Sequence, residues 1–284
     1  MTSSSTPAPA GTRSGTRADT GPATRADLVR RLVVTVAGIA CVTGTLVGTG
    51  VVGTPVADTA GGALSDDATL LAPAGPAFSI WSVIYAGLAA YVVWQWLPSQ
   101  AASPRMRATG WLAAASMVLN AGWLLVTQQD WVWGSVVVIV ALLAVLVEIV
   151  RRLHRDPARS AVEVVVVDGT FGLYLGWVAV ATCANTAAAL ASDDITLPAV
   201  PSALVVVLVA GAGVLAAWAL GGRWAVAGAI AWGLGWLAYG RVAESPESTL
   251  VAVVAVVAAV VVVLAAVGWH RRSPAAGALT RAGR

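Results

Sequence analysis

Long apolar runs separated by short polar segments dominate the sequence. Each run has about 20 residues, the length that an α-helix needs to cross the hydrocarbon core of a bilayer. Because only helices and closed barrels satisfy all their backbone hydrogen bonds in lipid, these runs predict membrane-spanning helices. The predicted spans are Leu32–Val52, Ala77–Leu97, Gly110–Gln128, Trp131–Val150, Val164–Leu190, Ala199–Leu220, Trp224–Tyr239 and Leu250–Trp269. The expected fold class is therefore an all-α, polytopic membrane bundle of about eight transmembrane helices.

The two flanking segments differ from the spans in composition. Residues 1–31 are rich in Ser, Thr, Pro, Ala, Gly and Arg, which predicts a disordered tail, and residues 271–284 are expected to form a cytoplasmic tail. The first span is longer than the apolar core of a secretory signal, so we expect it to remain uncleaved. Composition agrees with a membrane protein: 58% of the residues are hydrophobic and 11% are charged, against about 25% charged in soluble domains.

Arginines and acidic residues alternate between the predicted loops. Arginines precede the first span and follow the second, fourth, sixth and eighth spans. The other loops contain Asp58, Asp66, Asp67, Asp130, Asp193, Asp194, Glu244 and Glu247, with Arg241 as their one arginine. The positive-inside rule then places both termini in the cytoplasm, and we expect a bacterial cytoplasmic membrane. The arginines lie beside apolar spans and form no basic patch with exposed aromatics, so no nucleic-acid partner is expected.

The second predicted span carries an ordered aromatic stripe near its start. The segment "FSIWSVIY" places Phe78, Trp81 and Tyr85 at positions i, i+3 and i+7 of a helix. Two interpretations are open: an aromatic belt at the membrane surface, or one wall of a ligand pocket capped by the loop at residues 53–76.

Two further motifs follow on the third and fifth spans. The segment "LNAGW" contains Asn120 and Trp123, and "LYLGWVAVATCAN" contains Tyr174, Trp177 and Asn185. The last three residues follow i, i+3 and i+11, so they share one helix face. Amides within a membrane bundle commonly form ordinary interhelical hydrogen bonds, which is the alternative to a role in a pocket.

The three motifs, in this order, resemble the TspO/MBR family, the tryptophan-rich sensory proteins related to the mitochondrial translocator protein. The resemblance implies a five-helix bundle over residues 32–190 with a pocket for porphyrins, sterols or synthetic ligands. Residues 191–270 would add three transmembrane helices, as in a longer branch of the family. The implied ligand-binding residues are Trp81 and Trp177, with Phe78, Tyr85, Asn120, Trp123, Tyr174 and Asn185 around them.

The sequence departs from the family pattern at three places. The first-loop signature of tryptophan and two prolines is reduced to Pro73 and Pro76, and Leu173 replaces the proline before Tyr174. No tyrosine and arginine follow Asn185, so the proposed sterol-recognition stretch is absent. A sterol is therefore not the expected ligand, while an apolar or porphyrin-like ligand stays open.

These observations predict a membrane-embedded binding or sensory protein for a hydrophobic, porphyrin-like (tetrapyrrole) ligand. The alternatives are a transporter for a small hydrophobic molecule and a light-dependent porphyrin-degrading activity. No catalytic residues, metal ligands or bound cofactor are expected, and the expected partners are the lipid bilayer and the hydrophobic ligand. The spacing of Gly44 and Gly48 leaves a homodimer open as well.

Two acidic residues lie close to the spans. Glu148 can reach Arg151 or Arg152 at the end of the fourth span. Asp168 lies inside the membrane if the fifth span begins at Val164, and at the interface if its core begins at Thr170. An acid at mid-membrane would be a functional hypothesis by default, and the interfacial alternative is favoured.

Overall fold

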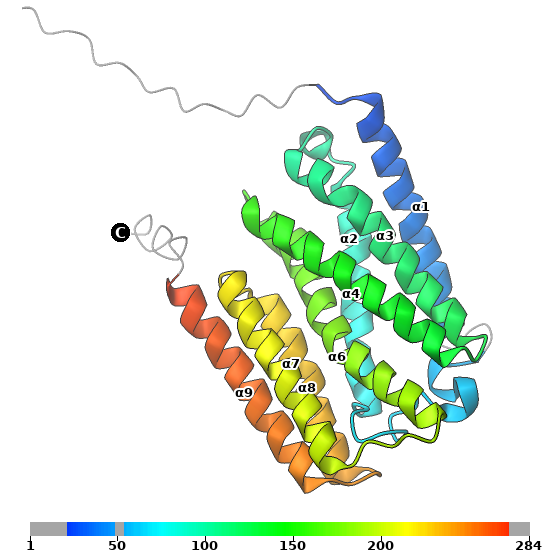
Figure 1. Cartoon of the computed structure of the whole chain (residues 1–284). Coiled ribbons are helices and arrows are strands. Elements are labelled where there is room, and N and C mark those ends of the chain that lie inside the picture. The colour runs from blue at the N-terminus through cyan, green and yellow to red at the C-terminus, as the bar shows by residue number, and fades with distance from the viewer. Residues whose placement is uncertain (1–21, 49–53, 273–284) are drawn as a thin grey trace, which may run out of the picture.

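All regular elements of residues 22–48 and 54–272, which the computed structural model describes, are helices (Figure 1). The predicted all-α polytopic fold is thereby confirmed. The long helices are α1 (Arg25–Gly48), α2 (Ile80–Trp94), α3 (Pro104–Thr127), α4 (Val132–Arg155), α6 (Thr170–Ser192), α7 (Ala199–Ala219), α8 (Trp224–Ala243) and α9 (Thr249–Arg272). The short ones are η1 (Val56–Gly62), η2 (Gly75–Ser79), η3 (Pro98–Gln100), α5 (Ala161–Glu163) and the π-helical turn η4 (Val164–Gly169).

Seven helical segments in the described part of the chain are long and apolar enough to cross a membrane. They are Arg25–Thr45, Gly75–Trp94, Pro104–Thr127, Val132–Arg155, Ala161–Ser192, Ala199–Ala219 and Thr249–Arg272. The remaining predicted span forms helix α8, which is not among the seven. Helix α8 has 20 residues and a charged residue, Arg241, in its last turn. Its role as an eighth crossing stays a prediction.

Helix α1 begins at Arg25 rather than at Leu32, so residues 25–31 are helical and do not belong to a disordered tail. The reason is a reciprocal cap: the backbone N–H of Thr24 donates to the Asp27 carboxylate, and that of Asp27 donates to Thr24 Oγ1. Residues 1–21 and 273–284 of the two predicted tails lie outside the described residues.

The predicted fifth span is divided into α5, the π-helical turn η4 and α6. The cap at its start is Ser160, whose side chain accepts a hydrogen bond from the backbone N–H of Glu163. Asp168 lies in the π-helical turn just before α6, which begins at Thr170. The whole segment Ala161–Ser192 is long and apolar enough to cross a membrane, so both alternatives for Asp168 stay open.

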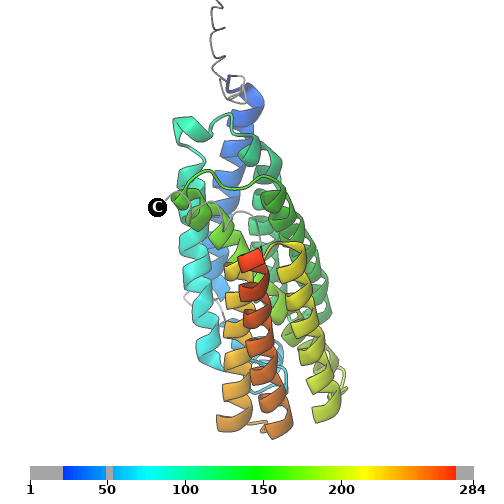
Figure 2. The ribbon, with the colours of Figure 1, turned by 90° about the vertical axis from the view of Figure 1, so that its left-hand side faces the viewer.

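The helices pack in an order that differs from their order along the chain. Helix α3 lies against α1 and α4, α6 lies against α4 and α8, and α9 lies against α8 and α7, while α2 contacts α1 and α6 (Figure 2). One core of buried apolar side chains continues from α1 to α9. It crosses the boundary that separates the five-helix part, residues 32–190, from the additional helices.

Two glycines illustrate how closely helices approach in this core. A Cβ added at Gly176 of α6 would lie 2.8 Å from Ala229 Cβ of α8, so only glycine fits without a shift. A Cβ added at Gly44 of α1 would lie 3.3 Å from Ala121 Cα of α3. Gly44 therefore packs within the same chain, and a homodimer through this motif stays a prediction.

Helix α1 begins and α9 ends at the same end of the bundle (Figure 1). We call this the arginine-rich end, because Arg30, Arg105, Arg107, Arg152 and Arg223 lie there. The opposite end carries residues 54–79, between α1 and α2, and is called the loop end. The placement of both described termini at one end agrees with an even number of crossings.

The arginine-rich end is held by buried ion pairs. Asp168 accepts hydrogen bonds from Arg105 Nη2 at 2.7 and 2.8 Å and pairs also with Arg223. Arg105 is 2% exposed, and its Nη1 lies 3.1 Å from a carboxylate oxygen of Glu163. Asp168 thus joins α3 to the turn before α8 through two arginines.

Glu148 makes the contact that the sequence predicts. Its carboxylate accepts hydrogen bonds from Arg151 Nε at 2.6 Å and Arg152 Nε at 2.7 Å. All three side chains are between about a quarter and a half exposed, so this cluster lies at the surface of the bundle.

Candidate ligand pocket

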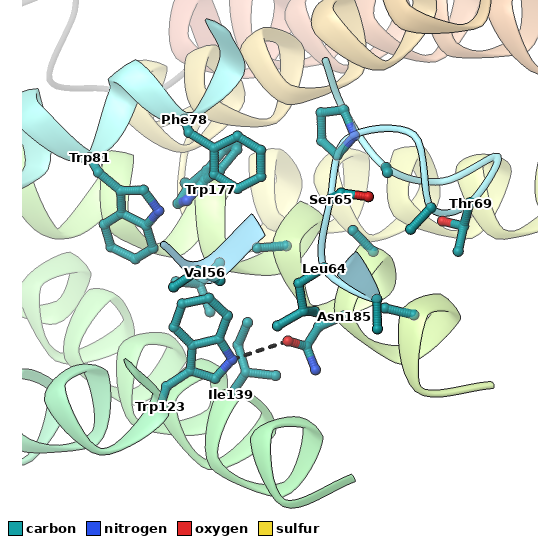
Figure 3. Close-up of a pocket in the computed structure, with 18 of the residues that line it drawn as sticks. Val56, Leu64, Ser65, Thr69, Phe78, Trp81, Trp123, Ile139, Trp177 and Asn185 are labelled. Atoms are coloured by element: carbon teal, nitrogen blue, oxygen red, sulfur yellow. Dashed lines mark hydrogen bonds between the residues drawn. The ribbon is translucent and has the colours of Figure 1, made fainter. Parts of the chain in front are cut away.

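An apolar cavity lies at the loop end, between residues 56–73 and helices α2, α3, α4 and α6 (Figure 3). The empty space among its lining atoms is about 690 Å³, a volume that includes the solvent in the open mouth. The lining residues are Val56, Ala63, Leu64, Ser65, Ala68, Thr69, Ala72, Pro73, Phe78, Trp81, Asn120, Trp123, Ile139, Leu142, Trp177, Val178, Ala181, Ala184, Asn185 and Ala188.

Three aromatic rings from η2, α2 and α6 form one side of the cavity. The rings of Trp81 and Trp177 are 6.3 Å apart at an angle of 86°, and those of Phe78 and Trp177 are 5.6 Å apart at 81°. Such edge-to-face pairs hold each ring in a fixed orientation. Trp177 is 1% exposed, whereas Phe78 is 39% exposed, so the aromatic wall runs from the interior to the mouth of the cavity.

The opposite side of the cavity is ordered by the amide of Asn185. Trp123 Nε1 donates to Asn185 Oδ1 at 3.1 Å, as Figure 3 shows, and Asn185 Nδ2 donates to Ser135 Oγ at 2.9 Å. Asn185 is 3% exposed and Ser135 is fully buried. The amide therefore uses both its donor and its acceptor within the protein, which fixes the Trp123 indole against α6.

Two buried polar groups of the cavity are poorly satisfied. Trp177 Nε1 has no hydrogen-bond partner among the described residues. Asn120 is 1% exposed, and its amide lies 3.5 Å from the Tyr85 hydroxyl, at the limit of a hydrogen bond. A buried donor without a partner costs about 1–3 kcal/mol. A ligand that presents acceptors to these groups would recover part of that free energy.

Six of the eight predicted site residues line this cavity: Phe78, Trp81, Asn120, Trp123, Trp177 and Asn185. The two tyrosines do not. Tyr174 is fully buried behind Trp81, with ring centroids 5.8 Å apart, and its hydroxyl donates to the Ser116 carbonyl oxygen. Tyr85 stacks on Trp81 with ring centroids 5.3 Å apart and lines a separate groove between α1 and α2.

The two tyrosines therefore support Trp81 from behind. Both tyrosines lie on the predicted helix faces, but the Trp81 ring lies between them and the cavity. A position on the predicted face was therefore not sufficient for contact with the cavity.

Sequence reasoning missed two further sources of lining residues. Helix α4 contributes Ile139 and Leu142, which carry no signal that distinguishes them from other apolar residues of a span. The loop contributes Ser65 and Thr69, the polar side chains at its inner surface. The sequence predicted that this loop covers the pocket, but not which of its side chains face the pocket. Their positions depend on the folded conformation of the loop.

The described part of the chain contains no group of three or more His, Cys, Asp or Glu side chains that could hold a metal ion. The residues that line the cavity offer aromatic contact together with a few hydrogen bonds from indole and amide groups.

The fold and the cavity define a polytopic helical membrane protein with an aromatic-lined pocket at one end. A family model described as TSPO-like protein matches residues 33–268, and the chain belongs to this family. Membership of this family indicates a membrane-embedded ligand-binding or sensory protein. The match continues through α7 and α8 and into α9. Comparisons with curated proteins and with solved structures give no match.

Proposed function

We propose that the cavity binds a flat, hydrophobic, porphyrin-like ligand and that the protein acts as a membrane-embedded sensor or regulator for it. The observation that carries the proposal is the set of four aromatic rings that line one cavity, those of Phe78, Trp81, Trp123 and Trp177, together with the unpartnered Nε1 of the buried Trp177. A tetrapyrrole offers a large aromatic face to such a wall and carboxylate oxygens that accept hydrogen bonds.

The test is a titration of the detergent-purified protein with protoporphyrin, followed through the absorbance of the porphyrin. This readout is preferable to tryptophan fluorescence, because each variant removes one of 13 tryptophans. The variants are Trp81→Phe and Trp177→Phe. The matched control is Trp218→Phe, which removes a 61% exposed indole on α7.

Saturable binding that weakens about tenfold in both pocket variants is expected, since each loses aromatic contact or the indole donor. The control should bind like the wild type. Identical, non-saturating curves in all four proteins would show that the porphyrin only partitions into the micelle, and the proposal would fail.

The same samples distinguish the two alternative functions. Irreversible loss of porphyrin absorbance under illumination, abolished in Trp177→Phe, would indicate a degrading activity. Porphyrin uptake into vesicles that contain the protein would indicate a transporter. A sensor should bind the porphyrin reversibly and move none of it across the bilayer.

We also propose that both termini face the cytoplasm and the pocket faces away from it. The support is the segregation of charge between the arginine-rich end and the loop end, which the positive-inside rule relates to orientation. In intact cells an impermeant maleimide should label Asp194→Cys and leave Arg155→Cys unlabelled, with Cys41 and Cys183 replaced in both. The reverse labelling would invert the topology.

A further inference from the structure

Helix α8 makes direct contacts with the segment that covers the pocket. Trp232 Nε1 donates to the Ala77 carbonyl oxygen at 2.9 Å, and the backbone N–H of Ala74 donates to the Trp236 carbonyl oxygen at 3.3 Å. A Cβ added at Gly240 would lie 3.4 Å from the Ala74 nitrogen, so the two backbones run close together. The segment from residue 66 to residue 77 is therefore fastened along one side of α8.

Arg241 provides the strongest of these contacts. Its Nη1 donates to the Thr69 carbonyl oxygen at 2.7 Å, and its Nη2 donates to the Asp66 carbonyl oxygen at 3.2 Å. The side chain is 1% exposed, and within the described residues it forms no ion pair with a carboxylate. A planar guanidinium can reach two carbonyls at once, which the single ammonium of lysine does less well.

The same segment also supplies part of the pocket wall. Ala68, Thr69, Ala72 and Pro73 line the cavity, and the Thr69 carbonyl is the one that Arg241 holds. A hydrogen bond joins the two ends of this segment: the Gly75 N–H donates to an Asp66 carboxylate oxygen at 2.9 Å. Arg241 thus binds the backbone of this segment on the side that faces α8, while the opposite side of the segment faces the cavity.

We infer that Arg241 is a positioning residue of the pocket: through Thr69 and Asp66 it holds residues 66–77 over the cavity and so limits escape of the ligand. The inference gives helix α8, which lies outside the five-helix part of the chain, a role in ligand binding. It rests on the proposed function for the ligand, but the position of the loop can be tested without any ligand.

The first experiment measures hydrogen exchange of the ligand-free protein in detergent. In Arg241→Gln, exchange in peptides from residues 66–77 should become roughly tenfold faster or more, because charge-assisted hydrogen bonds to the loop are lost. Peptides from α4 should keep their protection and thereby report that the bundle is folded. The control is Arg151→Gln, a 43% exposed arginine at the other end of the bundle.

A second variant removes a contact without removing a charge. Trp232→Phe deletes the hydrogen bond to Ala77 but keeps a ring at this 40% exposed position. It should accelerate exchange of the same peptides by a smaller factor. Arg241→Lys should fall between Arg241→Gln and the wild type. Unchanged exchange at residues 66–77 in both Arg241→Gln and Trp232→Phe would overturn the inference.

The second experiment measures the rate at which protoporphyrin dissociates. Arg241→Gln should release it about tenfold faster, with a smaller change in the association rate. If the wild type binds protoporphyrin saturably and Arg241→Gln releases it at the wild-type rate, the loop does not retain the ligand and the inference fails. If the wild type binds none, the proposed function fails, and hydrogen exchange still decides the position of the loop.

Discussion

The two ends of the bundle are held together by different kinds of interaction. At the arginine-rich end, Asp168 joins Arg105 and Arg223 in a buried ion network. At the loop end, the buried Arg241 donates only to backbone carbonyls such as that of Thr69. An ion pair broken in a buried site costs more than a single hydrogen bond between a charged group and a carbonyl. We therefore call the arginine-rich end the locked end.

The placement of the cavity fits this difference. Ligand entry requires that some hydrogen bonds open at a low cost in free energy. At the loop end, the hydrogen bonds from Arg241 to backbone carbonyls lie beside the aromatic cavity. The arginine-rich end, with its ion pairs between Asp168, α3 and the turn before α8, holds these elements together.

The largest effect is expected from removing the charge that organises the locked end. Asp168→Asn should lower the free energy of unfolding by about 3–5 kcal/mol, because the partly buried Arg223 loses its carboxylate and the buried Arg105 keeps only that of Glu163. The measurement is unfolding of the detergent-solubilised protein by heat or denaturant. A loss below about 1 kcal/mol, the value of a surface pair, would break the comparison, since the two ends would then be equally weakly held.

A smaller effect is expected at the wall of the pocket. Asn185→Leu should lower the free energy of unfolding by about 1–3 kcal/mol, because Trp123 Nε1 and the Ser135 hydroxyl lose their partner. In a double-mutant cycle with Trp123→Phe, a coupling of about 0.6 kcal/mol or more is expected. Strictly additive costs would show that the amide and the indole do not act together, and the wall would then be held by apolar packing alone.

The smallest effect is expected from an ion cluster that resembles the locked network but lies at the surface. Glu148→Gln removes the carboxylate that Arg151 and Arg152 share, yet these side chains are 43% and 42% exposed and can turn to water. No measurable change in unfolding is expected. A loss as large as that of Asp168→Asn would mean that burial does not distinguish the two clusters.

The motifs could be recognised from sequence because they are local. Spacing places Trp177 and Asn185 on one face of a helix, and the structure has both of them lining the cavity together with Trp81 and Trp123. Spacing also placed Tyr174 on that face, but its ring lies behind Trp81. Helical periodicity predicts which side chains point in the same direction. It does not predict which other side chains lie between them and the cavity.

The partners of charged residues were predictable only over short distances. Glu148 finds Arg151 and Arg152, three and four positions further on, because one helical turn brings them together. Asp168 instead pairs with arginines 63 and 55 positions away. The sequence identifies Asp168 as an acidic residue near the membrane. It does not indicate which of the 17 arginines pairs with this residue.

By itself the sequence determined the fold class, the approximate extent of each helix and the segregation of arginines from acidic residues, because hydropathy and charge act on each segment independently. It also determined the family, through three ordered motifs. Only the tertiary structure decided that α4 contributes to the cavity, that Asp168 pairs with distant arginines at one end, and that Arg241 donates hydrogen bonds to the loop at the other end. These features depend on which distant helices become neighbours, and apolar spans of similar composition carry almost no information about that choice.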